Sequence, residues 1–250
     1  MRTSLVLAAT ALFAVACASE SEEVLPVATR TTGVDTSHAA SSKEAARREN
    51  GFVRFVHAIP DLTAVDVYSN DIRVFPNVLY GTVTAYFELP EEGYKFRIRP
   101  SGQNLAVPMA EADEGVDEGR HYTVVAFREP DEGKAALRIY EDKLTPPETG
   151  TAKVRVVNAC PDAGELDVFT PGSEEALFTG VDHKAATDYA QVKPMTGVVT
   201  LHRKGEETTL ASLATTFDVG KVYTIVVYGW SKGSPPTLRT LVIEDRFGTP

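Results

Sequence analysis

The sequence predicts an all-β protein made of two tandem antiparallel β-sandwich domains, immunoglobulin-like or transthyretin-like, that follow a disordered tether. Three observations lead to this prediction. The segment after residue 50 occurs twice, each copy consists of short runs of alternating apolar and polar residues, and no long helical pattern separates those runs. The 250 residues provide enough chain for two domains of ordinary size.

Residues 1–16 are expected to form a lipoprotein signal peptide. Arg2 supplies the positive start, and Leu5–Ala16 is an apolar run shorter than the roughly 20 residues that a membrane-spanning helix needs. Small residues then precede Cys17, which resembles the lipobox of bacterial lipoproteins. That resemblance implies that Cys17 receives a diacylglycerol on its sulfur. An ordinary secretory signal followed by a chance cysteine is the alternative.

Residues 17–50 are expected to hold the lipidated cysteine and a flexible tether. This stretch is rich in Ser, Thr, Ala and Glu and has no aromatic residue, so it cannot bury enough apolar surface to offset its ordering entropy. We therefore expect an exported protein that is bound to the cell envelope by its lipid alone. Ala18 after the cysteine favours the outer membrane, on either its periplasmic or its surface face.

The repeat places two β-sandwich units at residues 51–145 and 150–246. Val53–Asp61 recurs as Val154–Asp162, and Val65–Tyr68 recurs as Leu166–Phe169, each 101 positions later. The connecting segment Lys143–Gly150 is polar and contains two adjacent prolines, so we expect a short, semi-stiff hinge.

Within each unit the apolar residues recur with the period of two that is typical of half-buried strands. In Gly93–Arg99, for example, Tyr94, Phe96 and Ile98 are expected to face the core, with basic residues between them facing water. The strands expected in the first unit are 52–57, 64–68, 82–88, 93–99, 121–127 and 135–141. Those expected in the second unit are 153–157, 165–169, 186–191, 197–203, 221–228 and 238–244.

The segments Val53–Asp61 and Ala64–Tyr68 resemble the start of the domain of unknown function 4397 family. The second copy departs from the family pattern at Asn158, where a histidine is usual, and at Gly164–Glu165. The resemblance implies secreted or surface-anchored bacterial and archaeal proteins, often with tandem copies and a β-sandwich fold. It implies no established activity.

A histidine and two carboxylates near the start of the first unit are the clearest candidates for a chemical site. His57, Asp61 and Asp66 together could carry out acid–base chemistry or bind a metal. The second unit has Asn at the corresponding position, and Asn is neither a general base near neutral pH nor a good zinc ligand. We therefore expect a binding or turn-structural role, and neither catalysis nor a metal site, for all six residues: His57, Asp61, Asp66, Asn158, Asp162 and Asp167.

Other features of the sequence exclude or favour particular partners. The formal net charge of −10 argues against nucleic acid. An acidic run between Glu111 and Glu118 is expected to be a solvated loop, with a calcium site as the alternative. Tyr228 and Trp230 could present an aromatic platform to a sugar, although a packing role is expected.

These observations predict a cell-envelope lipoprotein with two non-catalytic β-sandwich modules that serve binding, adhesion or structure. The sequence contains no glycine-rich phosphate loop and no paired Cys and His, so neither an enzyme nor a cofactor is expected. The expected partners are the membrane, through the lipid anchor, and an envelope polysaccharide or protein. The alternative is a secreted hydrolase or metal-dependent enzyme that uses His57, Asp61 and Asp66.

Overall fold

The computed structural model describes residues 50–130, 133–232 and 237–246. The expected signal peptide, Cys17 and nearly all of the expected tether lie outside these residues. The described part of the chain is all-β, with 16 strands in four sheets of four, which confirms the predicted fold class. None of its residues lies in a helix long and apolar enough to cross a membrane.

The first half of the chain forms two sheets that face each other. The inner sheet has the order β4-β1-β7-β8, and the outer sheet has the order β3-β2-β5-β6. The strands are β1 (Asn50–His57), β2 (Ala64–Ser69), β3 (Ile72–Leu79), β4 (Phe87–Pro90), β5 (Glu92–Pro100), β6 (Ala110–Val116), β7 (His121–Arg128) and β8 (Ala135–Glu141).

The second half repeats this arrangement, as the duplicated sequence predicts. Its inner sheet has the order β12-β9-β15-β16, and its outer sheet has the order β11-β10-β13-β14. The strands are β9 (Ala152–Asn158), β10 (Leu166–Phe169), β11 (Ala176–Val181), β12 (Ala190–Val192), β13 (Met195–Arg203), β14 (Thr209–Phe217), β15 (Val222–Tyr228) and β16 (Arg239–Asp245).

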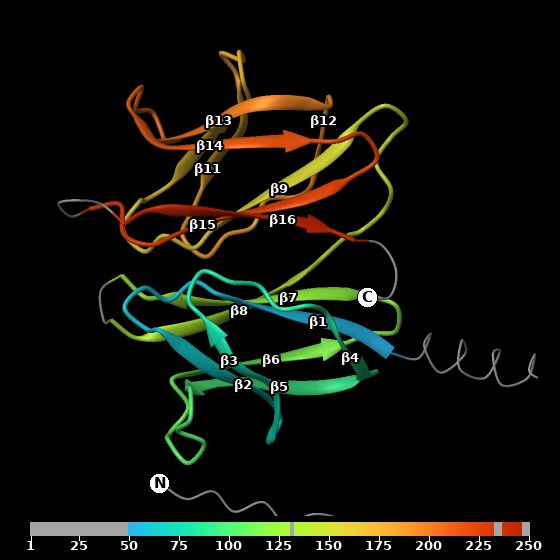
Figure 1. Cartoon of the computed structure of the whole chain (residues 1–250), viewed down its shortest axis with the longest axis vertical. Helices are drawn as coiled ribbons and strands as arrows, with labels where there is room; N and C mark the ends of the chain where they lie inside the picture. The colour runs from blue at the N-terminus through green and yellow to red at the C-terminus, as the bar shows by residue number, and fades with distance from the viewer. Residues whose placement is uncertain (1–49, 131–132, 233–236, 247–250) are drawn as a thin grey trace, which may run out of the picture.

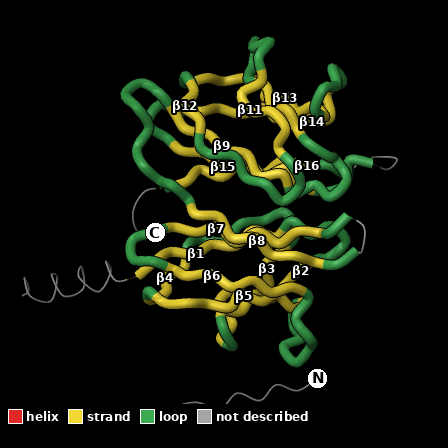
Figure 2. The backbone as a smooth tube through the Cα atoms, turned by 180° about the vertical axis from the view of Figure 1, so that it is seen from behind, coloured by secondary structure: helices red, strands yellow, loops and turns green. Residues whose placement is uncertain are grey.

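The four sheets stack in the order outer, inner, inner, outer (Figures 1 and 2). Most neighbouring strands are antiparallel, but β1 pairs with β7 in parallel and β9 pairs with β15 in parallel. The prediction of antiparallel sheets did not include these two pairs. Each of these pairs joins the first strand of a half to a strand much later in that half. Local alternation of apolar and polar residues does not encode such a long-range pairing.

Each half has its own apolar core between its two sheets. In the first half, β5 contributes Tyr94, Phe96 and Ile98 to this core, as the alternating pattern predicts. In the second half, the equivalent strand β13 contributes Val199 and Leu201. The period of two therefore sets which face of each outer sheet is buried.

A third apolar cluster lies between the two inner sheets. It includes Val56 and Phe127 from the first half and Val157 and Tyr228 from the second. The inner sheets are thus covered on both faces, which explains why β1 and β15 read as nearly continuous apolar runs. The prediction that residues 143–150 act as a hinge is wrong, because the two halves are held together by this buried interface.

The outer strands β3, β6, β11 and β14 were missing from the strands that the sequence predicted. In β3, Pro76 and Asn77 interrupt the apolar pattern, and Asn77 has a positive φ of 52°. Such residues are tolerated because β3 lies at the edge of its sheet. The expected strands 82–88 and 186–191 are largely irregular, and each makes one isolated bridge to an inner strand.

Candidate functional site

The side chains of His57 and Asn158 occupy the same place at the ends of β1 and β9. His57 Nδ1 accepts a hydrogen bond from the Ile59 N–H at 3.3 Å, and Asn158 Oδ1 accepts one from the Cys160 N–H at 3.1 Å. The Asn158 amide also donates to the carbonyls of Gly164 and Val181, at 2.9 Å each. Both side chains are fully buried. Each therefore supplies hydrogen bonds to the backbone turn that leaves an inner strand.

Burial also determines the protonation state of His57. It lowers the pKa of the imidazole to about 4, so the ring is neutral near pH 7. Its Nδ1 atom already accepts the Ile59 N–H. A general base needs an accessible lone pair near its substrate, and His57 Nδ1 offers none.

Asp66 and Asp167 hold two turns of their outer sheets. Asp66 Oδ1 accepts the Asn77 N–H at 2.7 Å, and Asp66 Oδ2 accepts the Gly102 N–H at 3.1 Å. In the second half, Asp167 accepts the N–H groups of Gly180 and Gly205 at 2.8 and 3.3 Å. The two aspartates thus perform the same task at corresponding positions.

Asp66 has the larger set of donors. Ser101 Oγ donates to it at 3.2 Å and Arg73 lies at 3.3 Å. Burial alone would raise the pKa of the Asp66 carboxyl, but these hydrogen bonds more than offset burial and hold that pKa below its ordinary value. Asp66 is therefore an ionised carboxylate surrounded by donors of its own fold.

Asp61 and Asp162 meet the loop that follows β15. Trp230 Nε1 donates to Asp61 Oδ2 at 3.1 Å, which connects the two halves. Asp162 accepts the N–H groups of Ser231 and Lys232, both at 2.7 Å, within the second half. Burial alone would raise the pKa of Asp162, and these N–H donors more than compensate and lower it. Asp61 has a positive φ of 66°, in keeping with its position in a tight turn.

Cys160 lies beside Asp162 in the same turn. Its thiol donates to Asp162 Oδ1 at 3.2 Å, and burial raises the pKa of Cys160 to about 12. The side chain is fully buried. Because the thiolate is the reactive form, Cys160 is an inert core residue near neutral pH.

The six residues thus fall in separate places rather than in one catalytic group. His57 and Asp61 both adjoin the junction between the halves, where the His57 ring packs edge-on against Tyr80 and Tyr80 packs edge-on against Tyr228. A surface hollow of about 430 Å³ lies here, lined in part by Asp61 and Tyr80. Tyr228 is buried, so the platform proposed for Tyr228 and Trp230 does not form. Asp66, unlike His57 and Asp61, accepts hydrogen bonds from turns of the outer sheet.

Residues 111–116 of the acidic run lie in a strand, which corrects the expected loop there, whereas Asp117 and Glu118 lie in the loop that follows. Glu111, Asp113 and Glu114 lie in β6, next to β5. Lys95 Nζ lies 3.4 Å from Asp113 and 3.7 Å from Glu111. Glu111 and Asp113 are exposed to solvent, as expected, and both also pair with a basic residue of the neighbouring strand.

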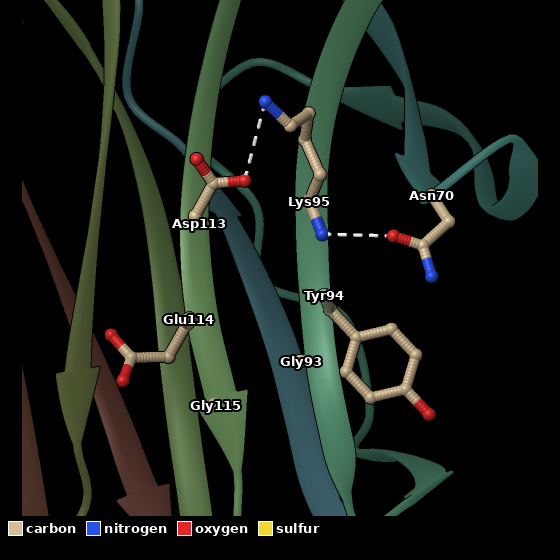
Figure 3. Close-up of a pocket in the computed structure, with 7 residues that line it drawn as sticks. All are labelled: Asn70, Gly93, Tyr94, Lys95, Asp113, Glu114 and Gly115. Carbon is tan, nitrogen blue, oxygen red and sulfur yellow. Dashed lines mark hydrogen bonds and ion pairs between the residues drawn. The ribbon is translucent and has the colours of Figure 1, made fainter.

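A shallow hollow of about 570 Å³ runs along this pair of strands (Figure 3). The Lys95 side chain turns towards Asp113, and its backbone N–H donates to Asn70 Oδ1 at 3.0 Å. Two of the charged side chains that line this hollow, Lys95 and Asp113, therefore pair with each other. Across the described ranges, no three His, Cys, Asp or Glu side chains are grouped so as to hold a metal ion.

A buried group of four charged side chains lies between the two inner sheets, and sequence reasoning missed it. We call Arg54, Asp142, Arg155 and Asp245 the Arg–Asp clamp. Arg54 Nη2 donates to Asp245 Oδ1 at 2.6 Å, and Arg155 Nη2 donates to Asp142 Oδ1. Each arginine therefore pairs with an aspartate of the opposite half, and all four side chains are at least 97% buried.

Neighbouring residues complete the clamp with matching contacts. Arg54 Nε donates to Thr123 Oγ1 at 2.8 Å, and Arg155 Nε donates to Thr224 Oγ1 at 2.9 Å. Thr123 and Thr224 donate in turn to Asp142 and Asp245, both at 2.6 Å. The two sets of contacts correspond because the two halves of the sequence are copies of each other.

Two tyrosines cover the arginines. The Arg54 guanidinium lies 4.8 Å from the centre of the Tyr86 ring, and Arg155 lies 4.8 Å from that of Tyr189. Their hydroxyls donate to Asp142 at 2.5 Å and to Asp245 at 2.8 Å. Every carboxylate of the clamp therefore has a charged partner, a threonine and a tyrosine.

Arg54, Arg155 and Asp142 are held in their charged forms. Burial alone would lower the pKa of Arg54, and the nearby Asp142 and Asp245 carboxylates more than reverse this and raise it. Burial alone would raise the pKa of Asp142, and Arg155 and Arg54 instead hold it below the ordinary value. A signal for the clamp was present in the sequence, since Arg54 and Arg155 are charged residues within apolar strands at the same position of both copies.

Comparisons with known proteins identify part of the chain. A family model described as "Domain of unknown function (DUF4397)" matches residues 51–169. No curated protein matches the chain. A solved structure titled "Alpha-glucan binding by a streptococcal virulence factor" is 11% identical, with 70% of this chain and 92% of that chain covered and a TM-score of 0.22. At that TM-score the likeness carries no argument about fold or ligand. Residues 51–169 are therefore similar to the DUF4397 family.

Proposed function

We propose that this protein is an exported cell-envelope lipoprotein whose paired β-sandwiches bind an envelope partner and catalyse no reaction. The observation that carries the proposal is that the candidate acid–base groups are occupied by hydrogen bonds within the fold. His57 is buried and accepts a backbone N–H, and Asp66 accepts donors at both carboxylate oxygens. These groups stabilise the fold, which leaves binding surfaces as the source of function.

The buried interface between the halves supports a binding role. The Arg–Asp clamp and the apolar cluster between the inner sheets hold the two outer sheets on opposite sides of one body. A binding protein gains affinity from surfaces that are ordered before the ligand arrives, because less conformational entropy is lost on association. The lipid at Cys17 would hold this body at the outer membrane.

Substitution of the predicted lipidated cysteine tests the anchor. Cys17→Ser is expected to release the protein from the membrane fraction and to abolish incorporation of radiolabelled palmitate. Cys160→Ser is the matched control, because Cys160 is buried in the second half and has no role in the anchor. Unchanged membrane association and labelling of Cys17→Ser would contradict lipidation at this residue.

Binding and catalysis are separated by two further measurements on the purified protein. Binding predicts retention on at least one fraction of isolated envelope polysaccharide or protein. The enzymatic alternative predicts turnover in a panel of ester, glycoside and peptide substrates, and His57→Asn should abolish that turnover. Background retention on every fraction would overturn the binding role, and turnover lost in His57→Asn would establish the alternative.

A further inference from the structure

The two outer sheets carry an equivalent pair of side chains in different surroundings. In the first half, the Arg99 guanidinium lies 4.4 Å from the centre of the Tyr68 ring. In the second half, the rings of Phe169 and His202 lie 4.9 Å apart at 43°. The positions correspond because Asp66 is paired with Arg99 and Asp167 is paired with His202.

In the first half this pair is covered. Tyr68 is only 6% exposed, and Arg99 Nε donates to the Ala106 carbonyl at 2.8 Å, which ties it to the loop 101–109 between β5 and β6. The corresponding connection in the second half, 204–208 between β13 and β14, is shorter. The cover over the aromatic position is therefore reduced in the second half.

The other connection of the second outer sheet is longer and forms a wall. Residues 170–175 join β10 to β11, whereas residues 70–71 join β2 to β3. A Cβ atom on Gly197 would come within 2.7 Å of Pro171, so Pro171 packs directly against β13. The result is a hollow of about 440 Å³ with Phe169 and His202 at its base, which we call the Phe169–His202 groove.

Hydrogen bonds hold both sides of this groove in place. Ser173 N donates to the Thr170 carbonyl at 3.1 Å, and Ser173 Oγ donates to the Glu175 carbonyl at 2.7 Å. On the opposite side, His202 Nδ1 lies 3.2 Å from the Glu206 carbonyl and Nε2 lies 3.3 Å from Thr209 Oγ1. With both nitrogens engaged, the imidazole presents its face rather than its edge to a ligand.

The groove is acidic. Glu174 lines one side, Glu206 and Glu207 line the other, and no Lys or Arg is among its lining residues. Arg203 comes within 3.9 Å of Glu206, but its other guanidinium nitrogens donate to Ala163 and Ser231. In the part of the chain that the structure describes, Glu174 and Glu207 have no cationic partner. Charge complementarity therefore calls for a cation.

We propose that the Phe169–His202 groove binds a protonated amino sugar unit of an envelope polysaccharide. The proposal rests on the proposed binding function and names a ligand class for it. The apolar C–H face of a sugar ring suits the base formed by Phe169, His202 and Val198, and the ammonium group suits the surrounding carboxylates. A lysine side chain offers the same charge on a slender stem that would leave most of the base uncovered.

Isothermal titration of the purified protein with a glucosamine hexamer tests this assignment. The N-acetylglucosamine hexamer is the uncharged counterpart, and a hexalysine peptide supplies the charge without the sugar. The glucosamine hexamer is expected to bind at least about tenfold more tightly than either, and to weaken as salt is raised, because exposed ion pairs are screened. Equal binding of the N-acetylated hexamer, or tighter binding of hexalysine, would overturn the proposal.

Variants place the binding in the groove. Phe169→Leu keeps an apolar side chain but removes the ring, and is expected to weaken glucosamine binding about fivefold. Glu206→Gln combined with Glu207→Gln is expected to weaken it about tenfold. The matched control is Glu111→Gln with Asp113→Asn, which removes two exposed acids from the outer sheet of the first half.

Thermal melting of each variant checks that the fold is retained. Loss of binding in the groove variants alone, with unchanged melting, supports the proposal. Equal loss in the control pair, or none in the groove variants, overturns it. If the glucosamine hexamer does not bind while the protein still retains another envelope fraction, the amino sugar assignment fails and the proposed binding function stands.

Discussion

The guanidinium of Arg54 lies 2.6 Å from the carboxylate of Asp245, a residue 191 positions away in the other half of the chain. The duplicated pair Arg155 and Asp142 repeats this contact in the opposite direction. Both pairs are cut off from water, so each charge depends on its partner for solvation. The Arg–Asp clamp therefore couples the stabilities of the two halves.

Removal of one partner of the clamp should be strongly destabilising. Arg54→Ala leaves Asp245 buried without its charged partner, and we expect a loss of about 3–5 kcal/mol in the free energy of unfolding. Urea denaturation followed by tryptophan fluorescence and far-UV circular dichroism measures this loss. The control is Lys143→Ala, which removes an exposed pair with Asp188 and should change stability by less than about 0.5 kcal/mol. A loss for Arg54→Ala as small as that of the control would show that the clamp is not closed in solution.

A buried neutral histidine makes stability depend on pH. The pKa of His57 is about 4 in the folded state and 6.5 in its unperturbed form, so the unfolded chain binds a proton first as pH falls. The contribution is complete above pH 6.5 and is lost between pH 6.5 and 4, by about 3 kcal/mol.

The variant His57→Asn, which carries the side chain found at residue 158, should show a shallower loss over that range. Urea denaturation at pH 7 and at pH 4.5 compares the two proteins. Burial lowers the pKa of His121 and His183 as well, so part of the pH dependence should remain in the variant. Identical slopes for the variant and the original protein would refute the burial of a neutral His57.

Asp66 and Asp167, the corresponding aspartates of the two outer sheets, should contribute differently to the free energy of unfolding. Asp66 accepts hydrogen bonds from two backbone N–H groups, Ser101 and Arg73, whereas Asp167 accepts two backbone N–H groups. Asp66→Ala should cost about 2–3 kcal/mol and Asp167→Ala about 1–2 kcal/mol, because buried donors lose their acceptor. Urea denaturation measures both, and Asp66→Asn, which retains one acceptor oxygen, should fall between Asp66→Ala and the original protein. The reverse order of the two alanine variants would contradict this assignment.

Substitutions at two glycines distinguish the cost of a left-handed backbone from the cost of crowding between the halves. Gly81 has a φ of 73° and a Cβ there would meet the Tyr228 hydroxyl at 2.7 Å, whereas Gly119 has a φ of 69° and open space around it. Gly119→Ala should cost about 1 kcal/mol from its left-handed conformation alone. Gly81→Ala should cost about 1–3 kcal/mol more, because it also crowds the interface. Equal thermal shifts for the two variants would mean that Tyr228 is not packed against Gly81 in solution.

The sequence by itself determined the all-β class, the duplication and most inner strands, because these depend on local alternation and on similarity between the two copies. Tyr94, Phe96 and Ile98 face the core of the first half as their spacing predicts. The outer strand β6 was missed because its acidic residues look like a solvated loop until Lys95 of β5 is placed beside them.

Only the tertiary structure decided how the halves join and what the polar residues do. Arg54 and Asp245 are 191 positions apart, and no local pattern distinguishes a buried charge with a distant partner from an exposed one. The opening of the groove over Phe169 likewise depends on two loops of different length that meet across the outer sheet. Local alternation encodes which face of a strand is apolar, whereas the contacts between sheets follow from how whole layers stack.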